Sequence, residues 1–106
     1  MTHLTKRSQV EWIVQNYIQH HTPMYDHYDG ESVEVWRQWG VVKVSGHVVV
    51  QALVSLRYTS DSKNEYHPNA EWSVGLLNEL ADQIGIHGFT VTKNEAHGQT
   101  CSLTVH

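Results

Sequence analysis

The sequence predicts an α+β domain in which two helices cover one face of a four-stranded antiparallel sheet. Three observations favour this class. Residues 33–58 alternate like one long β-hairpin around Ser45-Gly46, a two-residue turn signal. One stretch with apolar residues at helical spacing precedes this hairpin, and another follows it. Two further alternating stretches end the chain, so we expect one domain, residues 1–106, with the order α-β-β-α-β-β.

The hairpin should present two different faces, because side chains alternate along a strand. Folding the chain at Ser45-Gly46 places Glu34 opposite Arg57, a favourable cross-strand charge pair. One face is almost wholly apolar and is expected to cover the core. It carries Val33, Val35, Arg37, Trp39, Val41, Lys43, Val44, His47, Val48, Val50, Ala52, Val54, Leu56 and Tyr58.

The other face of the hairpin mixes aromatic, aliphatic and amide side chains, and we expect it to remain open to water or to a partner. Trp36 and Leu53 lie there among polar neighbours. Because Trp is enriched at protein interfaces, this outer face is the strongest indication of function. Alternatively, the loop from Tyr25 to Tyr28 covers Trp36. The expected partner-binding residues are Trp36, Gln38, Val49, Leu53 and Arg37.

The first helix is predicted from about Thr5 to His21. Ser8 and Glu11 match a capping box, Thr5 is a second possible cap, and Pro23 follows the end of the helix. Its apolar stripe consists of Val10, Ile13, Val14, Tyr17 and Ile18.

The second helix is predicted from about Asn69 to Ile84, with Gly85 as its stop and Ile86 folding back on its last turns. Gly75 lies inside it at a cost of roughly 1 kcal/mol relative to Ala. We expect that glycine to allow a close approach to the sheet. The expected stripe is Trp72, Val74, Leu77, Leu80, Ala81 and Ile84.

The remaining segments are expected to be strands and loops. We read residues 24–31 and 59–68 as loops. Two short strands should follow the second helix, joined by residues 94–99 with Gly98 in the turn. Their alternating positions are Phe89, Val91 and Lys93 in the first, and Cys101, Leu103 and Val105 in the second.

The composition excludes several classes of protein. The formal net charge is −4, and the seven Lys and Arg residues form no basic stripe, so the charge balance argues against nucleic-acid binding. If nucleic acid were bound, the contacts would be Lys6, Arg7, Arg57 and Tyr58. A single cysteine excludes an intramolecular disulfide. No signal peptide or membrane-spanning stretch is visible, so we expect a cytoplasmic protein.

Nine histidines are unusual for 106 residues, and several lie with aspartates between residues 20 and 29. His20, His27 and Asp29 are therefore weak candidates for metal ligands. Their spacing matches no established metal motif, and adjacent helical side chains such as His20 and His21 point roughly 100° apart. We expect solvated polar residues and no cofactor.

Two single residues have both a structural and a functional interpretation. Arg37 falls on the otherwise apolar face. One structural interpretation is that its stem packs there while its guanidinium reaches water. Another is that a β-bulge at Gly40 exchanges the two faces of the strand. The functional alternative is a buried Arg that pairs with a carboxylate or an anionic ligand. Cys101 is expected to be a core residue, and the alternative is a catalytic thiol paired with His97 or His106.

We expect a non-enzymatic protein, of the accessory or inhibitor type found in bacteria and phages, that binds another protein or itself as a homodimer. The absence of catalytic motifs and the outer face of the hairpin motivate this expectation. A second hypothesis is a small ligand-binding domain or enzyme with a site between the sheet and residues 25–29. Its polar groups would be His27, Asp29 and Arg37.

Overall fold

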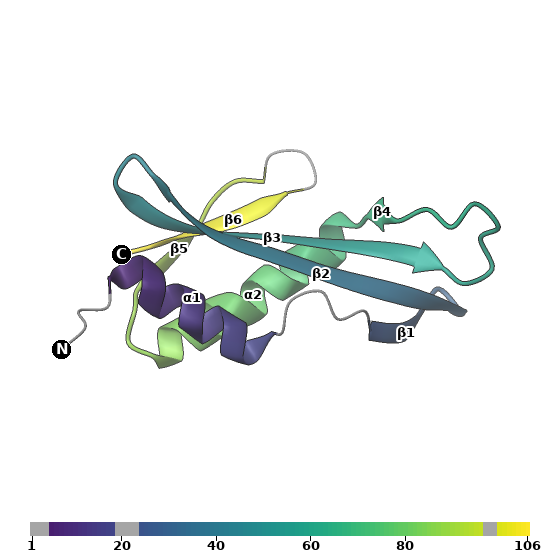
Figure 1. Ribbon diagram of the computed structural model, residues 1–106, viewed down its shortest axis with the longest axis horizontal. Coiled ribbons are helices and arrows are strands. Elements are labelled where there is room, and N and C mark those ends of the chain that lie inside the picture. Colours follow the sequence, from purple (N-terminus) through teal and green to yellow (C-terminus); the bar gives the residue numbers. More distant parts are fainter. Residues whose placement is uncertain (1–4, 19–23, 97–99) are drawn as a thin grey trace.

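The computed structural model describes residues 5–18, 24–96 and 100–106, and two helices lie on one face of a strongly twisted antiparallel sheet (Figure 1). The strand order is β1-β2-β3-β6-β5, and β4 pairs with the remaining part of β3. Within the described residues the sheet therefore has six strands, and the predicted four-stranded sheet was wrong. The elements in chain order are α1 (Lys6–Tyr17), β1 (Met24–Tyr28), β2 (Glu31–Val44), β3 (His47–Tyr58), β4 (His67–Pro68), α2 (Ala70–Ile86), β5 (Val91–Lys93) and β6 (Cys101–Val105).

The long hairpin of β2 and β3 has the predicted register. Val44 pairs with His47, and Glu34 pairs with Arg57. Ser45 and Gly46 both have positive φ angles, 50° and 80°, as a tight two-residue turn of the primed type requires. Gly40 pairs regularly with Gln51, so no bulge exchanges the two faces. The inner face is therefore the predicted one except at the turn, and both helices lie on it (Figure 1). Val44 and His47, which were predicted on the inner face, lie on the outer face, because side chains alternate and their neighbours Lys43 and Val48 occupy the inner positions.

The segment read as a loop before the hairpin is instead the edge strand β1. It pairs with β2 through a second tight turn, in which Asp29 and Gly30 have φ angles of 54° and 78°. Asp-Gly is among the strongest short hairpin signals, and the polar composition of residues 24–31 concealed it. Met24 and Asp26 lie opposite the inward-facing residues of β2, so they also belong to the inner face.

Helix α1 begins at the second of the two predicted caps. The Thr5 hydroxyl accepts a hydrogen bond from the Ser8 backbone N–H at 3.1 Å. The helix ends at Tyr17, earlier than predicted, and residues 19–23 with His20 and His21 lie outside the described part. The predicted stripe is buried except for Tyr17, which is 40% exposed.

Helix α2 begins after Asn69, whose side chain accepts a hydrogen bond from the Trp72 N–H at 3.0 Å. It continues through Gly85, and Gly88, with a φ of 96°, follows its end. The predicted stop at Gly85 was therefore wrong. Ile86 does not fold back on the helix but is 75% exposed.

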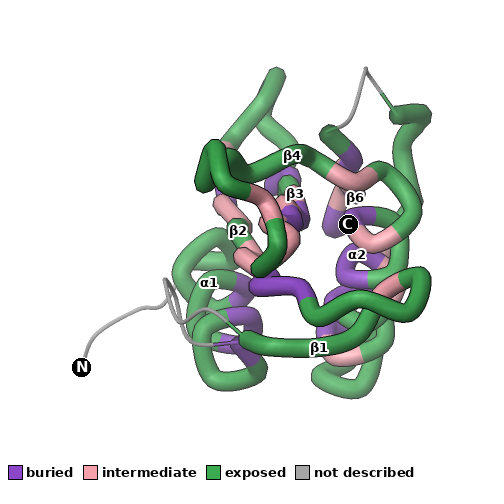
Figure 2. Tube along the Cα trace, turned by 90° about the vertical axis from the view of Figure 1, so that its right-hand side faces the viewer, coloured by how far each residue is buried: buried purple, intermediate pink, exposed green. Residues whose placement is uncertain are grey.

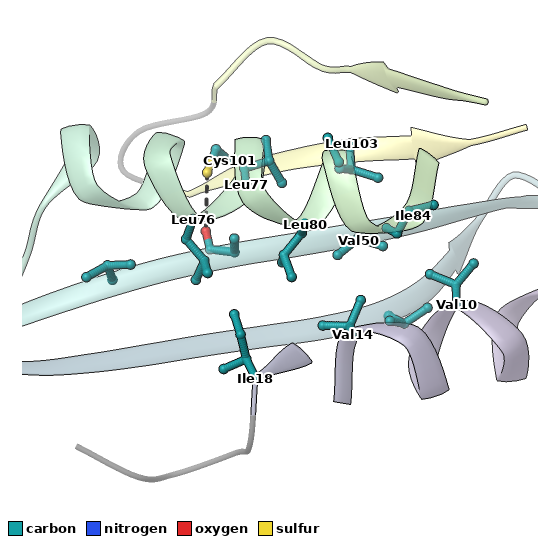
Figure 3. Close-up of a cluster of buried hydrophobic side chains, with 14 of the residues drawn as sticks. Val10, Val14, Ile18, Val50, Leu76, Leu77, Leu80, Ile84, Cys101 and Leu103 are labelled. Carbon is teal, nitrogen blue, oxygen red and sulfur yellow. Dashed lines mark hydrogen bonds between the residues drawn. The ribbon is translucent and has the colours of Figure 1, made fainter. Parts of the chain in front are cut away.

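The core lies between the helices and the inner face of the sheet, where the buried positions gather in Figure 2. Figure 3 shows the aliphatic side chains of α2 beside β3 and β6, and those of α1 beside β2. Leu76, which the predicted stripe omitted, is buried, whereas Val74 is 44% exposed. Fully or nearly fully buried members include Val10, Val14, Ile18, Val33, Val50, Leu80, Ile84 and Leu103.

Ser73 connects α2 to the edge of β3. Strand β6 pairs with β3 at residues 48–52 and β4 pairs with it at 55–56, so Val54 lies between the two ladders. There the Val54 N–H donates to the Ser73 hydroxyl at 2.8 Å, and the Asn69 N–H donates to the Val54 carbonyl at 2.8 Å. Ser73 is fully buried, and its own hydroxyl proton is directed to the Asn69 carbonyl at 2.7 Å.

Replacing Ser73 by Ala is expected to lower the free energy of unfolding by about 1–3 kcal/mol, because the buried Val54 N–H loses its acceptor. Urea unfolding measures this change, and Ser62→Ala in the exposed 59–66 loop is the control. If the two variants have equal stability, the Ser73 hydroxyl does not hold β3 to α2.

Candidate functional site

The outer face of the sheet is the side that neither helix covers (Figure 1). Gln38 and Gln51 are exposed there, Trp36 and Leu53 are half-buried, and Val49 is buried, with 9% of its surface exposed. Two hollows deepen this face, with volumes of about 240 and 500 Å³. The larger one is lined by Val44, His47, Val49, Gln51, Thr92, Asn94, Ser102, Thr104 and His106. Apart from its histidines, this lining is uncharged.

A charged and aromatic cluster closes one end of the outer face. The Arg57 guanidinium donates to the Glu34 carboxylate through Nη2 at 2.6 Å and Nε at 3.1 Å. The Tyr66 hydroxyl and the Trp36 indole N–H donate to the other carboxylate oxygen at 2.7 and 3.1 Å. Three residues thus satisfy the carboxylate of Glu34, a residue that is only 7% exposed, and we call the four residues together the Glu34 cluster.

The Glu34 cluster also fixes the orientation of Trp36. The Trp36 and Tyr66 rings meet edge to face with centroids 5.8 Å apart, and the Arg57 guanidinium lies 5.9 Å from the Tyr66 ring centre. The residue that partly covers Trp36 thus comes from the 59–66 loop and not from residues 25–28. Tyr66 could not be identified from the sequence, because the sequence of a polar loop has no pattern that indicates which strand residues the loop contacts.

The hydrogen bonds shift the titration of Glu34. Donation by Tyr66 and Arg57 holds the pKa of the Glu34 carboxyl below its ordinary value, with smaller contributions from the Arg57 charge and Trp36. Partial burial opposes this shift without reversing it. The same contacts raise the pKa of Arg57. The cluster is therefore a compact, neutralised ion pair at the end of a largely uncharged face.

The predicted partner-binding residues lie on two faces. Trp36, Gln38, Val49 and Leu53 share the outer face, as their register requires. Arg37 lies on the inner face opposite Val54, and together with Asp26 and residues of α2 it lines a pocket of about 510 Å³. The predicted set thus combines residues of one continuous face with one residue that faces the helices.

The second predicted site, near residues 25–29, is arranged differently from the expectation. His27 lies on the outer side of β1, and Asp29 is in the tight turn. Neither lines the pocket with Arg37, which receives Asp26 instead. Among the described residues, no three His, Cys, Asp or Glu side chains gather in a metal-binding arrangement, and His20 lies outside them.

Cys101 is a core residue. Its thiol is 3.2 Å from the Ser73 carbonyl and 3.5 Å from that of Ala52, and it donates toward both. Burial raises the pKa of the thiol above its ordinary value. His106 is bonded to Thr92 instead, at 2.8 Å, while His97 lies outside the described residues. The arrangement favours the structural interpretation of Cys101.

The residues suggested for nucleic-acid contact do not form one surface. Lys6 and Arg7 begin α1 at one end of the molecule, whereas β3 ends with Arg57 and Tyr58 at the other (Figure 1). The charge of Arg57 is offset by Glu34.

Within the described residues, no helix is long and apolar enough to cross a membrane.

A further exposed aromatic residue lies on α1. Trp12 is 59% exposed, meets His87 edge to face at 6.1 Å and lines a hollow of about 250 Å³. Its position outside the apolar stripe of α1 was the signal that sequence reasoning overlooked.

Comparisons with protein-family models, curated proteins and solved structures found no match for this chain.

The Glu34 cluster predicts a pH-dependent contribution to stability. Because the folded-state pKa of Glu34 is lowered, the contribution is fully present above the ordinary Glu value of about 4.3 and is lost as the pH falls through the folded-state value. The difference in unfolding free energy between the wild type and Glu34→Gln should therefore begin to shrink as the pH falls to about 4.3, and should continue to shrink until the pH lies below the folded-state pKa.

Urea unfolding at several pH values measures this difference, with Glu95→Gln, an exposed carboxyl outside the cluster, as the control. A wild-type advantage over Glu34→Gln that stays constant down to low pH would show that the carboxylate charge does not stabilise the fold.

Cys101 is expected to react with a thiol reagent only when the protein opens, because it is buried and its pKa is raised. Labelling with an excess of iodoacetamide at pH 8, followed by mass spectrometry, should show slow modification of the native protein and rapid modification in urea. Equally fast labelling in both states would contradict its place in the core.

Proposed function

We propose that the protein acts without catalysis, as an accessory or inhibitor type of protein that binds another protein, or a second copy of itself, through the outer face of the sheet. The observation that carries this proposal is a helix-free face on which Trp36, Leu53 and Val49 lie among uncharged polar side chains. Depletion of charge at the centre and enrichment of aromatic residues are typical of interface cores.

The Glu34 cluster supports the same proposal. An indole held by a hydrogen bond and an edge-to-face ring contact loses little conformational freedom on binding. Trp36 is thus a pre-positioned contact residue at the border of the face. The smaller hollow on this face is lined by Gln38 and Leu53, among others, and is open enough to receive a side chain of a partner.

A single charge at the centre of the face tests the proposal. Leu53→Glu should weaken self-association or partner binding at least about tenfold, because the new carboxylate would be buried without a partner. Sedimentation equilibrium over a range of concentrations measures self-association, and co-purification of one defined partner measures the alternative.

The matched control is Val74→Glu, an equal change at an exposed position of α2 away from the face. Circular dichroism and thermal unfolding establish that both variants fold. If Leu53→Glu binds as tightly as the wild type, or if Trp12→Ala abolishes binding while Leu53→Glu does not, the outer face is not the interface.

A further inference from the structure

A second candidate site lies on the opposite side of the sheet, in the pocket of about 510 Å³ between the inner face and α2. Strands β2 and β3 contribute Val35, Arg37 and Val54, and the edge strand β1 contributes Met24 and Asp26. Helix α2 forms the opposite wall with Glu71, Trp72, Gly75, Leu76 and Glu79. Its volume falls within the range of small-molecule sites in proteins, about 300–1,000 Å³.

Gly75 gives the pocket its space. Glu71 and Glu79 lie one turn before and one turn after it, so the three positions share one face of α2. A Cβ atom at Gly75 would meet no atom within 4 Å, so the expected close approach to the sheet is absent. Because Gly75 has no side chain, an open space remains between Glu71 and Glu79 on this face of α2.

Arg37 supplies an unsatisfied donor. Its Nε atom is buried and has no hydrogen-bond partner among the described residues. The ion pairs of the described part join Arg57 and His67 to carboxylates and do not include Arg37. Since leaving a buried charged donor unpaired is unfavourable, Arg37 is suited to a ligand that carries an anionic group.

The carboxylates of the pocket restrict the identity of this ligand. Among the described residues that line the pocket, Asp26, Glu71 and Glu79 outnumber the one guanidinium, so this lining carries an excess of negative charge. Glu79 also lies close to Tyr17 and contributes to raising its pKa, after burial, while Arg37 opposes this effect. A phosphate or another simple anion would meet repulsion from these carboxylates, and a simple diamine would meet repulsion from Arg37.

We propose that this pocket binds a small zwitterion of the basic amino-acid class. The ligand carboxylate would pair with Arg37, and its cationic groups would lie toward Glu71, Glu79 and Asp26. The aliphatic stem would pack against Val35, Val54 and Leu76. This site is independent of the outer face and is a binding function beyond the one proposed above.

Isothermal titration calorimetry with three matched compounds tests the ligand class. L-lysine carries both kinds of group, L-norleucine lacks the terminal amine, and cadaverine lacks the carboxylate. We expect saturable binding of L-lysine, at least about tenfold tighter than that of either analogue. Absence of lysine binding, equal binding of cadaverine, or tighter binding of inorganic phosphate would each overturn the proposal.

Two variants test the location. Arg37→Gln should weaken the binding of L-lysine at least about tenfold, because it removes the contact with the ligand carboxylate. The same variant should not weaken the binding of cadaverine, which has no carboxylate. Gly75→Leu should abolish lysine binding by filling the pocket. The matched controls are Lys63→Gln, an equal charge change in an exposed loop, and Gly85→Leu, a glycine of the same helix outside the pocket with equally open space.

Thermal unfolding shows whether Arg37→Gln and Gly75→Leu fold, and the NMR signal of the Arg37 Nε–H gives a readout that needs no variant. That signal should shift on addition of L-lysine and not on addition of cadaverine. Lysine binding that survives both variants, or that leaves the Nε–H signal unmoved, would place the ligand elsewhere and overturn the proposal.

Discussion

The structure depends on the hydrogen bonding of β3, whose two edges are occupied along nearly its whole length. One edge pairs with β2, and the other is shared by β6, the Ser73 hydroxyl, the Asn69 N–H and β4. Buried backbone groups need partners, so the gap at Val54 requires a side chain of α2. The first turns of α2 are thus fixed against the sheet at the point where two ladders end.

That arrangement gives the two faces of the sheet different chemistry. The inner face meets both helices and buries the aliphatic core, whereas the outer face keeps an uncharged surface with one neutralised ion pair at its end. A charge pair as well satisfied as Glu34 and Arg57 contributes orientation, because its remaining lone pair positions are filled by Tyr66 and Trp36. The Glu34 cluster thereby holds the Trp36 side chain in a fixed orientation, which reduces the conformational entropy that Trp36 would lose on contact with a partner.

The pocket on the inner face arises from two departures from a regular core. Arg37 occupies a position that an aliphatic residue would fill, and Gly75 occupies one where alanine would favour the helix by about 1 kcal/mol. Each is unfavourable alone, and they line the same cavity. Departures from local consistency of this kind tend to mark functional sites.

The sequence by itself determined the register of β2 and β3, the two helices and the burial of Cys101, because alternation and helical spacing are local properties. It did not reveal β1, β4 or the contact of Tyr66 with Glu34, since polar segments carry no periodic signal for the partner they pair with. The unpartnered Arg37 and the open space at Gly75 were decided only by tertiary structure. A pocket depends on the separation of α2 from the sheet, and no local pattern fixes that distance.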